Sequence, residues 1–268
     1  MKEHTRKKVN VFGVDVSVMR PDKAVNITLN YINRKELNKI YFHTAASSLF
    51  CQTREWAAQW IDSCDLVFSG DRALEEHTSS KDSVGNPEKS SHDLFADLYI
   101  KRLFYRMNKE SREIFVIMST EEHLTALKEY MHESYPEILV EGAVITEGSS
   151  AESEKVVNEI NGLIPDVVFV CLDSEKQLTL LHEYEAMMNT HLIVGIETIQ
   201  PMIQTEMEII PGWVETFHLT AFYKWIKKEG KIQEQIVHSL FRRTVLKEED
   251  SNTEEDKKII ENHDEGEE

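Results

Sequence analysis

Five short polar segments follow apolar runs in this sequence, and they hold the side chains best suited to acid–base chemistry. The segments are Thr44-Ala45-Ala46-Ser47, Ser69-Gly70-Asp71-Arg72, Ser119-Thr120, Asp173-Ser174-Glu175-Lys176-Gln177 and Glu197-Thr198. A carboxylate within hydrogen-bond reach of a hydroxyl group can act as its general base. Because open α/β sheets bind ligands outside the carboxyl ends of their strands, these segments are the candidate functional positions if the apolar runs are parallel strands.

The sequence lacks the local motifs that would identify a cofactor, a metal ion or a catalytic nucleophile. It contains no GxGxxG, GxxxxGK[ST], GxSxG, HExxH or paired CxxC motif. Its eleven histidines show no metal-ligand spacing, so we expect neither a metal ion nor another cofactor. The turn after the first apolar run reads Ser-Val-Met-Arg-Pro, and without glycine it cannot wrap closely around a pyrophosphate. This disfavours an unrelated Rossmann-like nucleotide-binding enzyme.

The elements that would position the polar segments alternate between strands and helices. Apolar runs rich in β-branched and aromatic residues predict strands at 9–16, 39–43, 65–68, 114–118, 138–140, 167–172 and 191–196. Apolar spacing predicts helices at 21–32, 53–63, 92–105, 120–134, 150–163 and 175–189. The serine-rich segment 78–91 predicts a mobile loop, either a plain surface loop or one that closes over a ligand. Several strands are continuously apolar, as in sheets covered on both faces. We therefore predict a Rossmann-like α/β fold with a mostly parallel sheet and helices on both faces.

Composition favours a globular cytoplasmic protein. The 268 residues are 41% hydrophobic, and their formal charge of −18 gives no indication of a nucleic-acid-binding protein. Three scattered cysteines, Cys51, Cys64 and Cys171, make no disulfide framework and fit a reducing compartment. The N-terminus does not resemble a signal peptide, and no apolar stretch approaches the roughly 18 residues of a membrane-spanning helix.

We predict three regions: a Rossmann-like domain at 1–210, an amphipathic appendage at 211–246 and an acidic disordered tail at 247–268. The appendage combines aromatic residues such as Trp213 and Trp225 with lysines and arginines. Such a segment can lie on an anionic membrane surface, and it can equally pack its aromatic face on the sheet domain. The tail holds eleven acidic and three basic residues, a net charge of −8, with few apolar residues.

Seven segments, in order and at near-constant spacing, match short motifs of one known family. Two early segments are VNVFGVDVSVMRPDKAV, at an opening strand, turn and helix, and HTAASSLF, at a Thr-x-Asn strand end. In this chain CDLVFSGDRAL corresponds to the family motif ADLVLPDGIGV, and HDLFADL corresponds to the family's G.DL helix start. The segment IFVIMSTEEHLTALKEYMHESYPEI corresponds to the family motif vFLLGG...A...L...YP.l. IPDVVFVCLDSEKQL stands at PDILLVGLGSPKQE, and LIVGIETIQPMIQTEMEIIPGW aligns without a gap on VIVGVGGSFDFLAGKVKRAPKW. Over residues 9–245 the chain thus resembles the WecG/TagA/CpsF family of glycosyltransferases (glycosyltransferase family 26).

The resemblance implies transfer of a hexosamine or related sugar from a UDP-sugar to a polyprenyl-diphosphate-linked sugar in cell-envelope polysaccharide synthesis. It implies a location in the cytoplasm, peripheral on the inner face of the membrane. Such a transfer needs a carboxylate base and cations that stabilise the leaving diphosphate. The matched positions give candidate residues for catalysis, for substrate binding, and for contact with the membrane or the diphosphate. The candidates for catalysis are Asp71 and Thr44. The candidates for substrate binding are Asp93, Lys176 and Gln177. The candidates for contact with the membrane or the diphosphate are Lys224, Arg242 and Arg243.

Many motif positions carry other residues, so two classes of function stay open. The expected catalytic Asp falls on Gly70, with Asp71 one residue later, and the motif Asn falls on Ala46. The first class is an active transferase, in which we expect Asp71, Thr44 and Gln177 to converge in one pocket. The second is a non-catalytic pseudo-glycosyltransferase, a binding or regulatory partner in the same pathway, because a fold tolerates changes that remove an active site. A homo-oligomer is compatible with either class.

Overall fold

The computed structural model describes residues 7–81, 94–197, 199, 239, 241 and 244, with the side chains of 79–81 left aside. The chain divides into two compact units, Met1–Ile210 and Pro211–Glu268, and both sheets belong to the first unit. Four candidate site residues, Asp93, Lys224, Arg242 and Arg243, lie outside the described residues. So do most of the expected loop at 78–91 and, apart from three single residues, the appendage and the tail.

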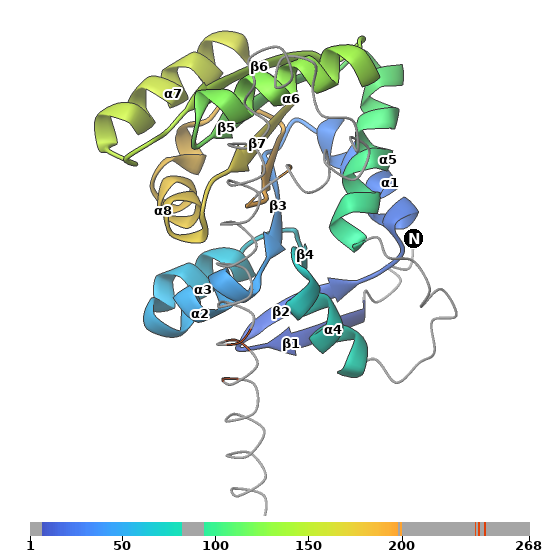
Figure 1. The fold of residues 1–268 in the computed structure, drawn as a ribbon, viewed down its shortest axis with the longest axis vertical. Coiled ribbons are helices and arrows are strands. Elements are labelled where there is room, and N and C mark those ends of the chain that lie inside the picture. Colours follow the sequence, from blue (N-terminus) through green and yellow to red (C-terminus); the bar gives the residue numbers. More distant parts are fainter. Residues whose placement is uncertain are drawn as a thin grey trace, which may run out of the picture. The chain divides into compact units, whose positions relative to one another are not determined.

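The first unit begins with a hairpin, where the sequence had predicted one strand at 9–16. Strands β1 (Lys7–Val11) and β2 (Val14–Val18) pair antiparallel, with Val11 opposite Val14. Between them Phe12 and Gly13 both have positive φ, 48° and 84°, as a two-residue type I′ hairpin turn requires. The predicted single strand was wrong because this turn lies inside a nearly continuous apolar run. In space the hairpin lies beside β4 (Figure 1).

The main sheet confirms the predicted mostly parallel architecture. In the described part of the chain it has six strands, in the order β4-β3-β8-β7-β5-β6, and all neighbours are parallel (Figure 1). The strands are β3 (Asn38–His43), β4 (Leu66–Ser69), β5 (Glu113–Met118), β6 (Leu139–Val144), β7 (Val167–Cys171) and β8 (Leu192–Gly195). Since all six run in one direction, their carboxyl ends share one edge of the sheet.

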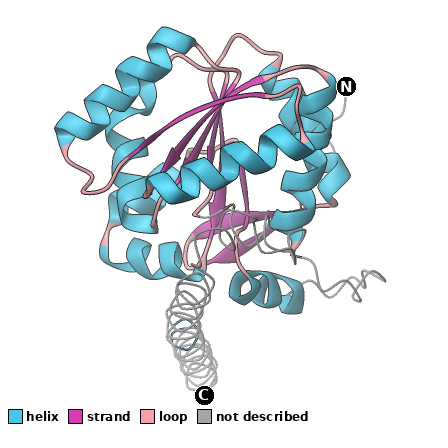
Figure 2. Cartoon of the chain, turned by 45° about the horizontal axis from the view of Figure 1, so that its top comes forward, coloured by secondary structure: helices cyan, strands magenta, loops and turns pink. Residues whose placement is uncertain are grey.

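Helices cover both faces of this sheet, also as predicted (Figure 2). On one face lie α1 (Pro21–Ile32), α5 (Phe95–Lys109) and α6 (Glu121–Ser134), whose buried residues join one core cluster. On the other lie α2 (Ala45–Thr53), α3 (Glu55–Asp62), α7 (Ser150–Leu163) and α8 (Ser174–Tyr184), with a short 3-10 turn at Glu185–Met187. Helix α4 (Arg72–Lys81) follows β4, so residues 78–81 are helical where a loop was expected.

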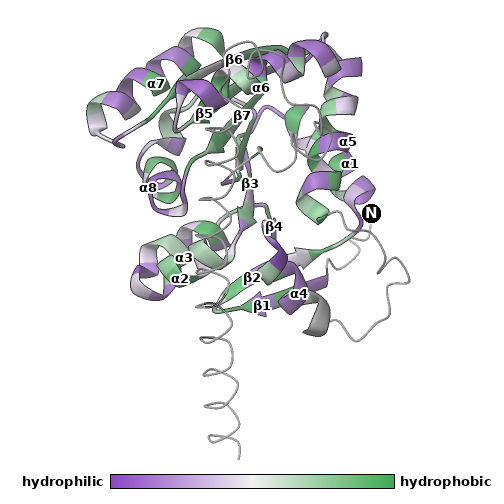
Figure 3. Cartoon of the chain, viewed as in Figure 1, coloured by the Kyte–Doolittle hydropathy of each residue, from purple (hydrophilic) through white to green (hydrophobic). Residues whose placement is uncertain are grey.

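Alternate residues of each strand serve the two faces. In β3, Ile40 and Phe42 belong to the core under α1, α5 and α6, and the ring of Phe42 lies 5.3 Å from that of Tyr99. Tyr41 points the other way and meets Trp60 of α3 edge-on at 5.7 Å. Every residue of β7 is buried and apolar, as expected of a strand covered on both faces, and Figure 3 shows β7 in green while α7 carries both colours.

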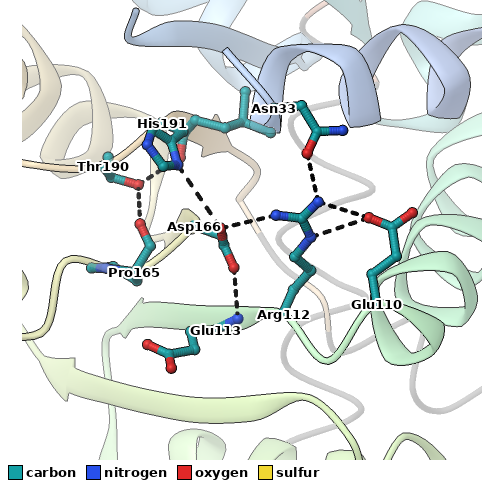
Figure 4. Close-up of polar contacts among 9 residues, drawn as sticks. Asn33, Glu110, Arg112, Glu113, Pro165, Asp166, Thr190 and His191 are labelled. Carbon is teal, nitrogen blue, oxygen red and sulfur yellow. Dashed lines mark hydrogen bonds and ion pairs between the residues drawn. The ribbon is translucent and has the colours of Figure 1, made fainter. Parts of the chain in front are cut away.

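A polar cluster holds the amino-terminal edge of the sheet together (Figure 4). Asp166, just before β7, accepts hydrogen bonds from the backbone N–H of Glu113 at 3.0 Å and from Arg112 at 3.2 Å. Arg112 also contacts Glu110 at 2.8 Å and Asn33 at 2.6 Å, beyond the ends of α5 and α1. This cluster lies at the edge opposite the strand ends that carry the candidate site, so we interpret it as structural.

Candidate functional site

Four neighbouring strands, β4, β3, β8 and β7, bring polar residues to the carboxyl edge of the sheet. Thr44 follows β3, Glu197 lies two residues after β8, and Ser174 lies three residues after β7. The Thr44 hydroxyl donates a hydrogen bond to Glu197 Oε1 at 2.9 Å, and the Ser174 hydroxyl donates to the same oxygen. A carboxylate thus joins the ends of three adjacent strands.

Helix capping explains why the chain places Thr44 and Ser174 there. Thr44 is the N-cap of α2, and a reciprocal capping box joins it to Ser47: Ser47 N–H donates to Thr44 Oγ1, and Thr44 N–H donates to Ser47 Oγ. Asp173 is the N-cap of α8 and accepts from the backbone N–H of Lys176 at 3.1 Å, which sets Ser174 at the first helical position. Both hydroxyls therefore sit on rigid turns.

A buried histidine, His43, precedes Thr44 and contacts the serines of the helix turn that Thr44 caps. His43 is fully buried at the end of β3, with Ser47 Oγ 2.7 Å from Nδ1 and Ser48 Oγ 2.9 Å from Nε2. Both serine hydroxyls also lie within hydrogen-bond distance of the Thr44 carbonyl oxygen. A neutral ring carries one N–H, so one of the two serines accepts from it and the other donates to it. Burial lowers the pKa of His43 to about 3, and the ring is neutral. Its role is to order the strand end.

Asp71 lies at the same edge as Thr44, and backbone groups hold it in place. Its Oδ1 accepts from Leu74 N–H at 2.8 Å, as an N-cap of α4, and its Oδ2 accepts from Ala45 N–H at 2.7 Å, at the start of α2. The preceding residue, Gly70, is packed against β3: a Cβ there would lie 2.9 Å from both the Phe42 carbonyl oxygen and Thr44 Cγ2. The position of the motif Asp therefore has no room for a side chain without movement of β3.

The structure does not bring Gln177 to the same surface as Thr44 and Asp71. The Gln177 side chain is fully buried, and its Nε2 donates to the carbonyl oxygen of Val170 in β7. Lys176 is partly exposed and forms an ion pair with Asp173 at 3.4 Å. Sugar or diphosphate binding by Gln177 and Lys176 stays a prediction, and binding by Gln177 would require its buried amide to turn outwards.

Glu197 and Ser174 were not among the residues that sequence reasoning selected as the site, although both lie in the polar segments that follow predicted strands. Glu197 is partly buried, and that burial raises the pKa of its carboxyl group above the ordinary range. The negative charges of Asp71 and Asp173 act in the same direction, while the hydrogen bonds from Ser174 and Thr44 act against it. The edge thus holds a carboxylate that retains its proton more readily than an exposed glutamate does.

The described part of the chain contains neither a cluster of metal ligands nor a helix that could span a membrane. No three His, Cys, Asp or Glu side chains among them gather as a metal site would require. None of the helices in this part of the chain is both long enough and apolar enough to cross a bilayer.

Comparison with known proteins identifies the family to which the chain belongs. The model of the glycosyl transferase WecG/TagA/CpsF family matches residues 9–250, which include all the main-sheet strands and each strand end of the site. A search of curated proteins found no match.

Proposed function

The chain belongs to the WecG/TagA/CpsF family of glycosyltransferases of cell-envelope polysaccharide synthesis, and we propose that it transfers a sugar from a UDP-sugar to a polyprenyl-diphosphate-linked acceptor. One observation carries the proposal: Thr44, Ser174 and Glu197 form a hydrogen-bonded cluster at the carboxyl edge of a parallel sheet. That edge is where α/β sheets of this kind bind their ligands. Hydroxyl and carboxylate groups suit the hydroxyl groups of a sugar.

We expect the sugar and the diphosphate of the substrates to contact different side chains, because these side chains differ in charge. Asp71, Asp173 and Glu197 make the strand ends acidic, which suits neutral sugar hydroxyls better than a diphosphate. The diphosphate needs cations, and the candidates are Lys176 together with Lys224, Arg242 and Arg243 of the C-terminal region. A lipid-linked acceptor would bring the protein to the inner face of the membrane as a peripheral protein.

A non-catalytic role is the second candidate, and the packing around Gly70 favours it. The motif Asp has no room there, and Gln177 is bonded to the backbone of β7. In this case the edge would bind a nucleotide-sugar or a partner of the same pathway without turnover, since a fold can be kept while its chemistry is lost.

Calorimetric titration and a turnover assay separate the two functions. We would titrate the full chain with UDP and with a panel of UDP-sugars: UDP-N-acetylglucosamine, UDP-glucose and UDP-galactose. UDP release would then be measured with farnesyl-diphosphate-linked N-acetylglucosamine as acceptor. Release that depends on this acceptor supports the transferase, and binding without release supports the non-catalytic role. If neither UDP nor any UDP-sugar binds, both nucleotide-sugar functions are wrong.

A further inference from the structure

Two carboxylates lie at the carboxyl edge near Thr44, and their hydrogen bonds differ in kind. Asp71 accepts backbone N–H groups at both oxygens, one from the first turn of α4 and one from the first residue of α2. Protonation of Asp71 would weaken bonds that fix two helix ends, because a carboxylic acid accepts less well than a carboxylate. Its place in the fold is therefore that of a structural acceptor.

Glu197 is held by side-chain hydroxyl groups instead, and at one oxygen only. Thr44 and Ser174 both donate to Oε1. Within the part of the chain that the structure describes, Oε2 accepts no hydrogen bond. Glu197 as a residue is intermediate between buried and exposed. Among the described residues, one carboxylate oxygen is held by hydroxyl groups at the starts of α2 and α8, while the other has no hydrogen-bond donor. That is the arrangement expected of a group that exchanges a proton with a ligand.

We propose that Glu197 is the general base that deprotonates the acceptor hydroxyl, in place of the family's Asp position occupied here by Gly70. This inference rests on the transferase function proposed above. Glu197 follows β8, which lies between β3 and β7 in the sheet, so it is central among the four strand ends. In the ungapped match Glu197 stands where the family motif has glycine. Relative to the motif, this chain thus gains a carboxylate after β8 and loses one after β4, at Gly70.

The step balances without any further reactant. The O–H bond of the acceptor breaks, and its proton passes to Oε2 of Glu197. The acceptor oxygen forms a bond to the anomeric carbon of the donor sugar, while the bond from that carbon to the β-phosphate oxygen breaks. UDP leaves with the electron pair of that bond, and the carboxyl group of Glu197 then returns its proton to water.

The electrostatics of the edge fit this role. Burial raises the pKa of Glu197, and the charges of Asp71 and Asp173 raise it further. A carboxylate that holds a proton more tightly is a stronger base, and general bases work best when their pKa lies near the working pH. Thr44 and Ser174 keep the carboxylate in one orientation during the transfer.

The test compares Glu197→Gln, Glu197→Ala and Asp71→Asn with the unchanged chain, and Glu121→Gln serves as a control at an exposed position of α6. Four quantities are measured: acceptor-dependent UDP release, its pH profile, the Kd for UDP by calorimetry, and rescue of Glu197→Ala by added formate.

We expect Glu197→Gln to lower turnover by about 10²-fold or more, the range typical of a general base, with the Kd for UDP changed by less than about threefold. The acidic limb of its pH profile should be lost, and formate should restore turnover to Glu197→Ala. Asp71→Asn should keep that acidic limb.

Each other outcome has a defined meaning. If Glu197→Gln keeps turnover within about threefold of the unchanged chain, the assignment is overturned while the transferase function stands. If the Glu197 variants lose thermal stability and UDP binding together, formate decides: no rescue of Glu197→Ala means that Glu197 is structural and the assignment is wrong. If the unchanged chain releases no UDP from any donor, the proposed transferase function fails, and the base assignment fails with it.

Discussion

At the scale of the residue, His43 shows how closely the strand end is organised. Both ring nitrogens have serine partners, the side chain is fully buried, and the two serines belong to the first turn of α2. A neutral imidazole satisfies both partners with one donor and one acceptor, so a second proton would have to enter a dry, fully paired site. The ring is therefore a candidate for a strong effect of pH on stability.

We predict that His43 makes the protein lose stability as the pH falls below about 6.5. The pKa of His43 is lowered to about 3, so between these values the unfolded chain binds a proton that the folded chain does not. Stability is fully present above the ordinary pKa and is lost as the pH falls through this window, by at most about 1.4 kcal/mol per pH unit. His43→Asn should be less stable at pH 7, and its disadvantage should shrink towards pH 4, measured by urea unfolding.

Ser48→Ala is the matched control for this prediction. It removes one partner of His43 but keeps the ring, so the free energy of unfolding should fall at every pH while its slope with pH stays close to that of the unchanged chain. A His43→Asn curve that runs parallel to that of the unchanged chain would contradict the prediction, since it would mean that another group causes the acid sensitivity.

The candidate residues could be predicted from the sequence only in part, and the reason is the direction of side chains. A strand end locates a residue at the edge of a sheet, and Thr44 and Asp71 do lie there together. Which atoms face the ligand depends on helix caps and on packing, which spacing alone does not encode. Packing turns the Gln177 side chain inwards, where it donates a hydrogen bond to the backbone of β7. Glu197 was not predicted as a site residue because the matched motif has glycine at its position.

At the scale of the element, caps and periodicity predicted the helices well where both signals were strong. The predicted bounds of α1 and α7 agree with the structure, because Pro21 opens α1 and a Ser149–Glu152 capping box opens α7. Helix α2 was missed, since its sequence AASSLFCQT has few large apolar residues and its start depends on the Thr44 cap. The hairpin was missed because its turn has no polar residue at the centre.

Two glycines give a test of element packing with opposite expected signs. In β6, a Cβ on Gly142 would lie 2.4 Å from the Val116 carbonyl oxygen of β5 and 2.7 Å from Leu124 Cδ1 of α6. Backbone atoms cannot yield cheaply, so Gly142→Ala should lower the free energy of unfolding by about 1–3 kcal/mol or more. In α7, Gly162 has open space around its Cβ position, so Gly162→Ala should raise that energy by up to about 1 kcal/mol.

Urea unfolding of the two alanine variants beside the unchanged chain measures both effects. Gly162→Ala also controls for the general effect of replacing glycine, which restricts the unfolded chain in both variants. Equal stability of the Gly142→Ala variant and the unchanged chain would show that β5 and β6 can separate at this point, contrary to the packing described.

At the scale of the whole molecule, charge is unevenly distributed along the chain. The tail at 247–268 contributes −8 of the total −18, so the other 246 residues carry −10. The preceding appendage contains the basic residues Lys224, Lys227, Lys228 and Lys231 among its aromatic residues. An anionic membrane would attract the appendage and repel the tail, and the two effects act on the same part of the sequence.

We predict that removal of residues 247–268 strengthens binding to anionic membranes. Aromatic burial and about 1 kcal/mol per basic residue near anionic lipid would drive binding by the appendage, while the tail opposes it by repulsion or by covering the lysines. Co-sedimentation with phosphatidylglycerol-containing liposomes should therefore increase for the truncated chain. The difference should be greatest at low salt, where the Debye length is long, and small with phosphatidylcholine alone.

Two controls separate charge from the loss of chain. A full-length variant in which the acidic residues of the tail are replaced by Gln and Asn should bind as the truncated chain does, because the charge of the tail and not its length is the cause. Replacement of Lys227 and Lys228 by glutamine in the truncated chain should reduce its binding again. If the truncated and full-length chains sediment equally with anionic liposomes, or if neither sediments, the membrane role is wrong. The aromatic residues of the appendage then belong to the protein core or to a contact with another protein.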